Sequence, residues 1–386
     1  MQNPEQAGYI APESEPEVPL LIDYALRGLK SCWMPEYGRW SHIYHLDGRA
    51  NPNETKPSSD IFYSLNVLVG LSRLSRYEKC HDFDIRAIFS NCVAEILKHK
   101  VPVYAYGTAL WASAELGLEL PENVRKVISD LIDSNDWAHF RAQDLGMLLA
   151  GCVRSAERAP DGQWSGAAQR LFKLLSERFA GPHGLFYDSA RGFRRNFSSF
   201  ATQTYLTLGC YIYGEWSNDK RALDLANACT AKLIELQGPQ GEWPWFYYTP
   251  AGRVVDFYEV YSVHQQGMAP AFLAPAEKHG APGAREALIK GFKWILGENQ
   301  MKKSMLWKKE SLICRSQVRG GELDNKFGRV ARSMLNAATG ARAQLADPAS
   351  LQLRLECRSY ELGWILYSFG PRGDLLELQN RPEFAA

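Results

Sequence analysis

The densest group of side chains able to do chemistry lies beyond the middle of the chain. Asp256, Tyr258, Glu259, Tyr261 and His264 bring two carboxylates, two phenols and an imidazole together within a short stretch. Tyr261 and His264 are three residues apart, so they share one face of any helix that begins here. An imidazole beside carboxylates and phenols can take up or release a proton near neutral pH. These five residues are therefore candidates for catalysis.

Two more carboxylates stand near the beginnings of predicted helices. Asp60 follows a Pro-Ser-Ser run and is either a helix cap or a catalytic group. Asp144 falls inside an apolar helical segment, where a carboxylate is buried only when it is paired or used. Two carboxylates on either side of a glycosidic bond can act as acid and base, or as acid and nucleophile. The available pairs join Asp144 to Asp60, Asp256 or Glu259.

Aromatic and guanidinium groups would complete such a site. Flat rings with a polar edge suit sugar rings, and arginine suits carboxylates. Arg194 and Arg195 stand in a short basic loop, which is equally typical of a solvated surface. We expect the following residues to bind substrate: Tyr106, Gln203, Trp243, Trp245, Tyr248, Arg194, Arg195, Arg358 and Tyr360. Tyr63, Tyr104, Gln143 and Gln265 also fall near predicted helix starts.

A repeated pair of helices must position these side chains. Six segments rich in Leu, Ala and Gly are apolar on all sides, as helices enclosed by others must be. They begin at Ser59, Tyr104, Arg141, Ser198, Tyr261 and Cys357. Segments with one charged face alternate with them, at residues 21–33, 83–98, 121–134, 167–179, 220–236 and 284–296.

This alternation predicts an all-α protein, an (α/α)6 toroid of six helical hairpins with inner and outer rings. The inner helices would run parallel, so that their N-termini meet at one cleft. A solenoid of helix pairs is the competing architecture. We expect residues 1–20 to form a disordered or extended arm and residues 21–386 to form a single domain. Strand signals are scarce, and residues 184–197 are expected to form a small hairpin.

Composition and motifs narrow the function. There are 44 basic and 43 acidic residues, so no overall field favours nucleic acid. The eight cysteines are scattered, which is typical of reduced, buried thiols. We find no signal-peptide pattern and no apolar run of membrane-spanning length, and we expect a cytoplasmic protein. The chain has no metal-ligand spacing and no phosphate loop, so we expect neither a metal nor another cofactor.

Two stretches resemble known toroidal families. Residues 237–243, Gln-Gly-Pro-Gln-Gly-Glu-Trp, resemble the Q-x3-G-x-W element of squalene-cyclase-type toroids. That resemblance implies a structural role, with Gln237 closing a helix end and Trp243 stacking beneath it. Residues 243–268 together with 358–364 are similar to toroidal proteins associated with bacterial exopolysaccharide biosynthesis. That similarity implies an oligosaccharide or polysaccharide intermediate as partner.

We therefore expect a carbohydrate-active enzyme whose cleft lies at the mouth of the toroid. It would be a glycoside hydrolase, or a uronate lyase or epimerase in which Tyr258 or Tyr261 and His264 move a proton while arginine neutralises the substrate carboxylate. An isoprenoid or terpene cyclase-like enzyme is an alternative, although the D-x-D-D motif of class II terpene cyclases is absent. A non-catalytic glycan-binding protein is another, because one fold hosts many functions.

Overall fold

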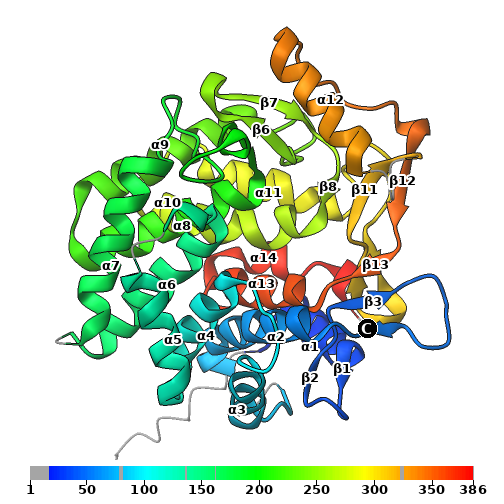
Figure 1. Cartoon of the computed structure of the whole chain (residues 1–386). Helices are drawn as coiled ribbons and strands as arrows, with labels where there is room; N and C mark the ends of the chain where they lie inside the picture. The colour runs from blue at the N-terminus through cyan, green and yellow to red at the C-terminus, as the bar shows by residue number, and fades with distance from the viewer. Residues whose placement is uncertain (1–16, 78–80, 135–136, 161, 322–325, 386) are drawn as a thin grey trace, which may run out of the picture.

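The computed structural model describes residues 17–77, 81–134, 137–160, 162–321 and 326–385, and in it inner and outer helices alternate (Figure 1). The fifth inner helix begins as a π-helical turn, η6. The inner helices are α2 (Pro57–Leu71), α4 (Val103–Leu116), α6 (Ala142–Arg158), α8 (Phe200–Ser217), η6 (His264–Met268) with α10 (Ala269–Lys278), and α13 (Ser359–Phe369). The outer helices are α1 (Leu20–Cys32), α3 (Ile85–Glu95), α5 (Glu122–Asp133), α7 (Gln163–Leu174), α9 (Lys220–Leu236) and α11 (Ala284–Ile295).

The two sets differ in burial as their sequences predict. In the outer helix α5 the buried side chains are Val124, Ile128 and Ile132, which are four residues apart and form one stripe. In the inner helix α4 the run from Gly107 to Ala112 is buried without interruption, because neighbours surround it. The pattern of charge along the sequence therefore separated inner from outer helices.

The inner helices form a closed ring. Each inner helix contacts the next along the chain, and the last one, α13, contacts the first, α2; Figure 1 shows these two side by side. The contact between them is close, since a Cβ added to Gly70 would lie 2.2 Å from the backbone oxygen of Gly363. A solenoid would leave its first and last repeats apart. The predicted (α/α)6 toroid is confirmed.

Short antiparallel sheets, in the part of the chain that is described, are built mainly from segments that lead into inner helices. Three sheets have three strands each: β13 (Glu356–Cys357), β3 (Ile43–His45) and β4 (Asn53–Glu54); β12 (Leu351–Arg354), β11 (Ser316–Arg319) and β8 (Val260–Tyr261); and β5 (Phe197–Ser199), β6 (Phe246–Tyr248) and β7 (Arg253–Asp256). Two sheets have two strands: β1 (Trp33–Met34) with β2 (Arg39–Trp40), and β9 (Leu306–Trp307) with β10 (Leu312–Ile313).

The hairpin expected at residues 184–197 does not form. This segment contains isolated bridges, Arg141 with Ser189 and Ala180 with Phe186, and a 3-10 turn, η4 (Phe193–Asn196). Strand β5 at its end pairs with the distant β6 instead of with a local partner, Ser198 facing Tyr247. Turn residues are present in this segment, but β5 pairs with a strand of another loop and a local hairpin does not form.

A further helix, α12 (Lys326–Thr339), lies in the long connection between α11 and α13. It contacts β7 beside the cleft, where Figure 1 shows it in orange. The Arg253 guanidinium donates to three carbonyl oxygens at and just beyond its C-terminal turn, those of Asn336, Ala337 and Ala341, at 2.7 to 3.0 Å. This helix was not expected from the sequence.

The first and last described helices pack together. The Leu20 backbone N–H, at the start of α1, donates to Asn380 Oδ1 at 3.1 Å, just after α14 (Leu376–Gln379). The rings of Tyr24 and Phe384 meet edge to face at 5.6 Å. Of the arm expected at residues 1–20, residues 1–16 lie outside the described residues. Within the described ranges, no helix has both the length and the apolar character needed to cross a bilayer.

Candidate active site

Two adjoining cavities open where the inner helices begin. The inner cavity has a volume of about 230 Å³, and the outer cavity has a volume of about 500 Å³. Each inner helix places a side chain in the inner cavity from its first two turns: Tyr63, Tyr104, Gln143, Ala201, His264 and Tyr360. The cavities share the residues Tyr104, Gln143, Ser199, Ala201 and Trp245. The two cavities therefore adjoin one another, and together they are called the cleft.

His264 is the titratable group at the base of the fifth inner helix. It is 5% exposed, and its ring centroid lies 4.6 Å from that of Phe200 and 5.0 Å from that of Tyr261. Its Nδ1 has no hydrogen-bond partner among the described residues. Burial, together with the positive charge of Arg315, lowers the pKa of His264 to about 3. The imidazole is thus neutral at physiological pH.

Arg315 brings a positive charge to the same cavity. Its guanidinium carbon lies 5.0 Å from the centre of the Tyr261 ring, and both residues line the inner cavity. The Tyr261 hydroxyl donates to Glu259 Oε2 at 3.2 Å. Burial, and next the charge of Glu259, raise the pKa of Tyr261, so the phenol stays protonated. A cation, a phenol and a neutral imidazole therefore face one space.

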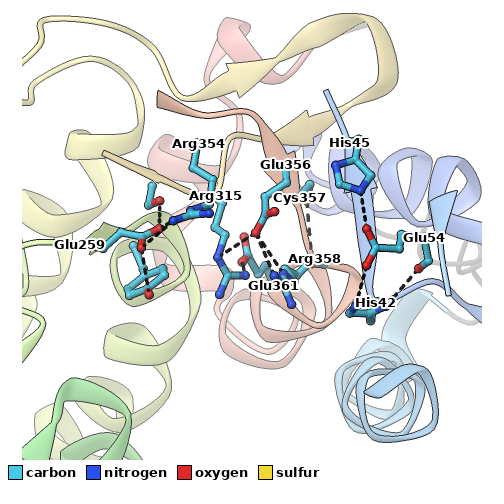
Figure 2. A network of polar contacts seen from close by, with 12 residues as sticks. His42, His45, Glu54, Glu259, Arg315, Arg354, Glu356, Cys357, Arg358 and Glu361 are labelled. Atoms are coloured by element: carbon cyan, nitrogen blue, oxygen red, sulfur yellow. Dashed lines mark hydrogen bonds and ion pairs between the residues drawn. The ribbon is translucent and has the colours of Figure 1, made fainter. Parts of the chain in front are cut away.

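A row of ion pairs holds Arg315 in position, as Figure 2 shows. Arg315 Nε lies 3.2 Å from Glu356 Oε1, and its Nη1 lies 3.4 Å from Glu361 Oε1. Arg358 Nη2 pairs with Glu356 at 2.9 Å, and its Nη1 donates to the Tyr63 hydroxyl at 3.3 Å. Burial raises the pKa of Glu361 to about 8, against the opposing effect of Arg315 and Arg358. These pairs restrict where the Arg315 head group can lie.

The expected carboxylates Glu259 and Asp256 are both engaged by arginines. Glu259 pairs with Arg329 and Arg354 at 2.8 Å each and accepts a hydrogen bond from Ser316. Burial alone would raise the pKa of Glu259, but the nearby Arg315 and Arg354 lower it. Asp256 is 1% exposed and accepts two hydrogen bonds from Arg319, at 2.8 and 3.2 Å. Neither carboxylate lines the two cavities.

Asp144 and Asp60 hold the starts of helices. The two Asp144 oxygens accept the backbone N–H groups of Tyr104 at 2.9 Å and of Arg141 at 3.0 Å. Burial raises the pKa of Asp144. Asp60 is fully buried and accepts the N–H groups of His42 at 3.0 Å and Lys56 at 2.9 Å. Both carboxylates satisfy backbone donors and lie outside the two cavities.

Three further expected site residues are buried elsewhere in the fold. Trp243 is fully buried, and its ring packs against Phe200 and Phe272. The expectation that it stands in the cleft is not met, because the turn that carries it inserts it between hairpins. Gln203 accepts from and donates to the Phe186 backbone at 2.7 and 2.8 Å. Tyr258 is fully buried, with the Arg319 guanidinium 4.6 Å from its ring centre.

The remaining expected binding residues divide into two groups. Trp245, Arg194 and Tyr360 line the cleft. Others lie outside both cavities: Tyr106, Tyr248, Arg195 and Arg358. Arg195 instead covers the Tyr187 ring at 3.5 Å from its centre, and the ion pair of Arg358 with Glu356 directs its guanidinium to the network behind Arg315.

Sequence reasoning missed Arg315, Glu361 and α12. Arg315 has no motif around it; its one signal is a charged residue directly after the short apolar run Leu312–Ile313 and Cys314. Glu361 is fully buried near the start of the last inner helix, a position comparable to that of Asp144. In the described part of the chain, no group of three or more His, Cys, Asp or Glu side chains could hold a metal ion.

Comparison with known proteins gives relatives by structure alone. No family model matches the sequence, and no curated protein matches it. Among solved structures, a cellobiose 2-epimerase from Bacillus thermoamylovorans superposes with a TM-score of 0.61 at 10% identity, covering 90% of this chain and 96% of that one. The chain shares its fold.

Two other similar structures are hydrolases. An unsaturated glucuronyl hydrolase from Bacillus sp., described as responsible for glycosaminoglycan degradation, has a TM-score of 0.54 at 13% identity and covers 91% of this chain and 94% of its own. An inactive variant of an α-1,6-mannanase of Salegentibacter sp., in complex with α-1,6-mannotriose, has a TM-score of 0.55 at 11% identity, with 93% and 98% covered. At these identities the likeness establishes the fold.

Proposed function

We propose that this chain is a carbohydrate-active enzyme that removes a proton from the carbon next to the carboxylate of a sugar acid, as uronate lyases and epimerases do. The observation that carries the proposal is that Tyr261, His264 and Arg315 line one small cavity. A guanidinium, an imidazole free to accept a proton and a phenol are the groups that this reaction needs.

Each group has a definite task in this reaction. Arg315 pairs with the substrate carboxylate and stabilises the negative charge that develops when the neighbouring C–H bond breaks. His264 accepts that proton on a nitrogen of its neutral imidazole. Its pKa is low in part because Arg315 is positive, and a bound carboxylate that neutralises Arg315 raises it again. Tyr261 or Tyr360 then donates a proton, either to the glycosidic oxygen as its bond to carbon breaks or to the opposite face of the carbon.

A two-carboxylate hydrolysis has weaker support. The four carboxylates expected for it, Asp60, Asp144, Asp256 and Glu259, accept hydrogen bonds from backbone or arginine donors. None of them lines the inner or the outer cavity, whereas a hydrolase needs both of its carboxyl groups beside the scissile bond. Among the residues that line the two cavities, the only carboxylate is that of Asp188.

The structural neighbours agree with a carbohydrate substrate. These neighbours include an epimerase acting on cellobiose and a hydrolase acting on an unsaturated glucuronyl group. A role on an exopolysaccharide intermediate in the cytoplasm, expected from the sequence, is part of this proposal. The terpene-cyclase and glycan-binding alternatives leave the Tyr261, His264 and Arg315 grouping unexplained.

The test compares variants of the three residues on uronate and neutral oligosaccharides. His264→Gln, Tyr261→Phe and Arg315→Lys should each lower turnover of a uronate substrate by about 10²-fold or more. Lyase activity is followed by the ultraviolet absorbance of the new C=C bond conjugated to the carboxylate, and epimerisation by uptake of deuterium from D₂O at the reacting carbon. Tyr258→Phe, a buried tyrosine outside both cavities, is the matched control and should retain activity.

Two results would contradict the proposal. One is full activity of His264→Gln and Arg315→Lys on every substrate that the wild type converts. The other is conversion of neutral oligosaccharides alone, with no deuterium uptake and no C=C product. Thermal melts of each variant establish that lost activity does not reflect unfolding.

A further inference from the structure

The outer cavity differs from the inner one in the chemistry of its walls. On the side of α12 it is lined by Val330 and Met334, and on the facing side by Phe193, Phe197 and Phe246. Aliphatic side chains offer no hydrogen bond to a sugar hydroxyl. Its volume of about 500 Å³ is twice that of the inner cavity.

Several polar and aromatic groups of this cavity contact one another. The Asp188 carboxylate accepts from Thr202 Oγ1 at 2.7 Å and lies 3.8 Å from Arg141 Nη2. Phe246 stacks on the Trp245 ring, with centroids 4.5 Å apart and planes 18° apart. Phe246 also stacks on Phe197 at 6.0 Å and 18°. A sugar ring binds to a free aromatic face, and here ring faces are turned toward one another.

Exposed apolar side chains line this cavity and continue along α12. Nine large hydrophobic residues are exposed in the described chain, and five of them belong to this region: Phe193 at 67%, Phe327 at 90%, Val330 at 38%, Met334 at 39% and Leu335 at 62%. Three of the five line the cavity, and four lie on α12. Apolar side chains concentrated in one place on a surface mark a binding site.

We propose that the outer cavity binds a hydrocarbon chain attached to the sugar that occupies the inner cavity. The two cavities share five residues, so one ligand can fill both with a polar head and an apolar tail. This inference takes from the proposed function only that the inner cavity holds the sugar; it does not depend on the reaction. The ligand class is a sugar acid carrying an alkyl, acyl or prenyl chain.

The test measures binding of octyl and methyl glucuronide to the full chain by calorimetry, below the concentration at which octyl glycosides form micelles. Each methylene that enters the cavity should tighten binding by about fourfold. The octyl compound has seven more methylenes than the methyl compound, and entry of only three of them would make it bind about 60-fold more tightly. Met334→Gln should remove most of this difference. Leu335→Gln is the matched control, because Leu335 lies next to Met334 and does not line the cavity.

The outcomes separate the alternatives. Equal affinities for octyl and methyl glucuronide would overturn the inference. Binding that tightens with each added uronate unit but not with alkyl length would also overturn it, because the cavity would then hold a second sugar. Equal weakening by Met334→Gln and Leu335→Gln would place the chain on the open face of α12 and also overturn it. Octyl glucoside binding as tightly as octyl glucuronide would support the hydrocarbon site and count against the uronate preference of the proposed function.

Discussion

His264 has its protonation state set by its surroundings, and this makes stability depend on pH. The imidazole titrates near its ordinary pKa of 6.5 when the chain is unfolded and at about 3 when it is folded. Between these values the unfolded chain binds one more proton, so the contribution of His264 is complete above pH 6.5 and is lost as the pH falls toward 3. The loss from this group is up to about 1.4 kcal/mol per pH unit.

We therefore expect wild type to lose about 2 kcal/mol more stability than His264→Gln between pH 6.5 and pH 5. The measurement is urea unfolding of both proteins at the two pH values. Other groups that titrate in this range are common to both proteins, so the difference isolates His264. Parallel losses in the two proteins would show that the folded imidazole is protonated in this range.

At the residue scale, the sequence predicts where a side chain lies better than it predicts what that side chain does. The sequence predicts His264, Tyr261 and Tyr360 at the cleft, and they line it. This prediction is possible because the residues around a helix start are enough to locate that start. Asp144 was recognised as a buried carboxylate, but one of its two partners, the Tyr104 N–H at the start of α4, lies 40 residues away. Arg315 reaches the cavity from a connection whose path is decided by contacts with β8 and β12, which no local pattern encodes.

At the scale of elements, Asp144 links the starts of two inner helices. Asp144→Asn keeps one oxygen, but it places an amide N–H₂ opposite the N–H of either Tyr104 or Arg141. One buried donor then loses its acceptor, which costs about 1–3 kcal/mol. Chemical unfolding should show this loss, whereas Asp130→Asn, in an exposed ion pair with Lys126 on α5, should change stability by less than about 1 kcal/mol. An unchanged free energy for Asp144→Asn would mean that the two helix starts do not depend on this carboxylate.

The helical hairpins could be predicted from the sequence, whereas helix α12 and the short strands around the cleft could not. Runs that are apolar on all sides define the inner helices locally, and periodic apolar residues define the outer helices. Helix α12 has the same kind of signal, but its apolar residues Phe327 and Leu335 face outward in the folded chain. The strands are two to four residues long, and several of them pair across distant loops, as β5 does with β6. Such pairing depends on the ring already being formed.

At the scale of the whole molecule, the ring depends on the contact between α2 and α13. A methyl group at Gly70 would meet the backbone of Gly363, so Gly70→Ala should lower the free energy of unfolding by about 1–3 kcal/mol. Gly209→Ala is the control within another inner helix, because the nearest atom to its new Cβ, Leu149 Cδ2, is 3.4 Å away. Equal stabilities of the two variants in urea would indicate that the ring tolerates a wider gap at its closure.

The hydrogen bond between the Leu20 backbone and the Asn380 side chain joins the first described helix to the end of the last one. It brings the two ends of the described chain together, so the closed ring has no structural first hairpin. A short peptide linker could join these ends, and the chain could instead be opened in an outer loop such as the one between α8 and α9. Every inner-helix contact would remain in such a circular permutant. Because the six helix starts that surround the cleft keep their neighbours, the cleft would be assembled from the same residues in a different order of synthesis.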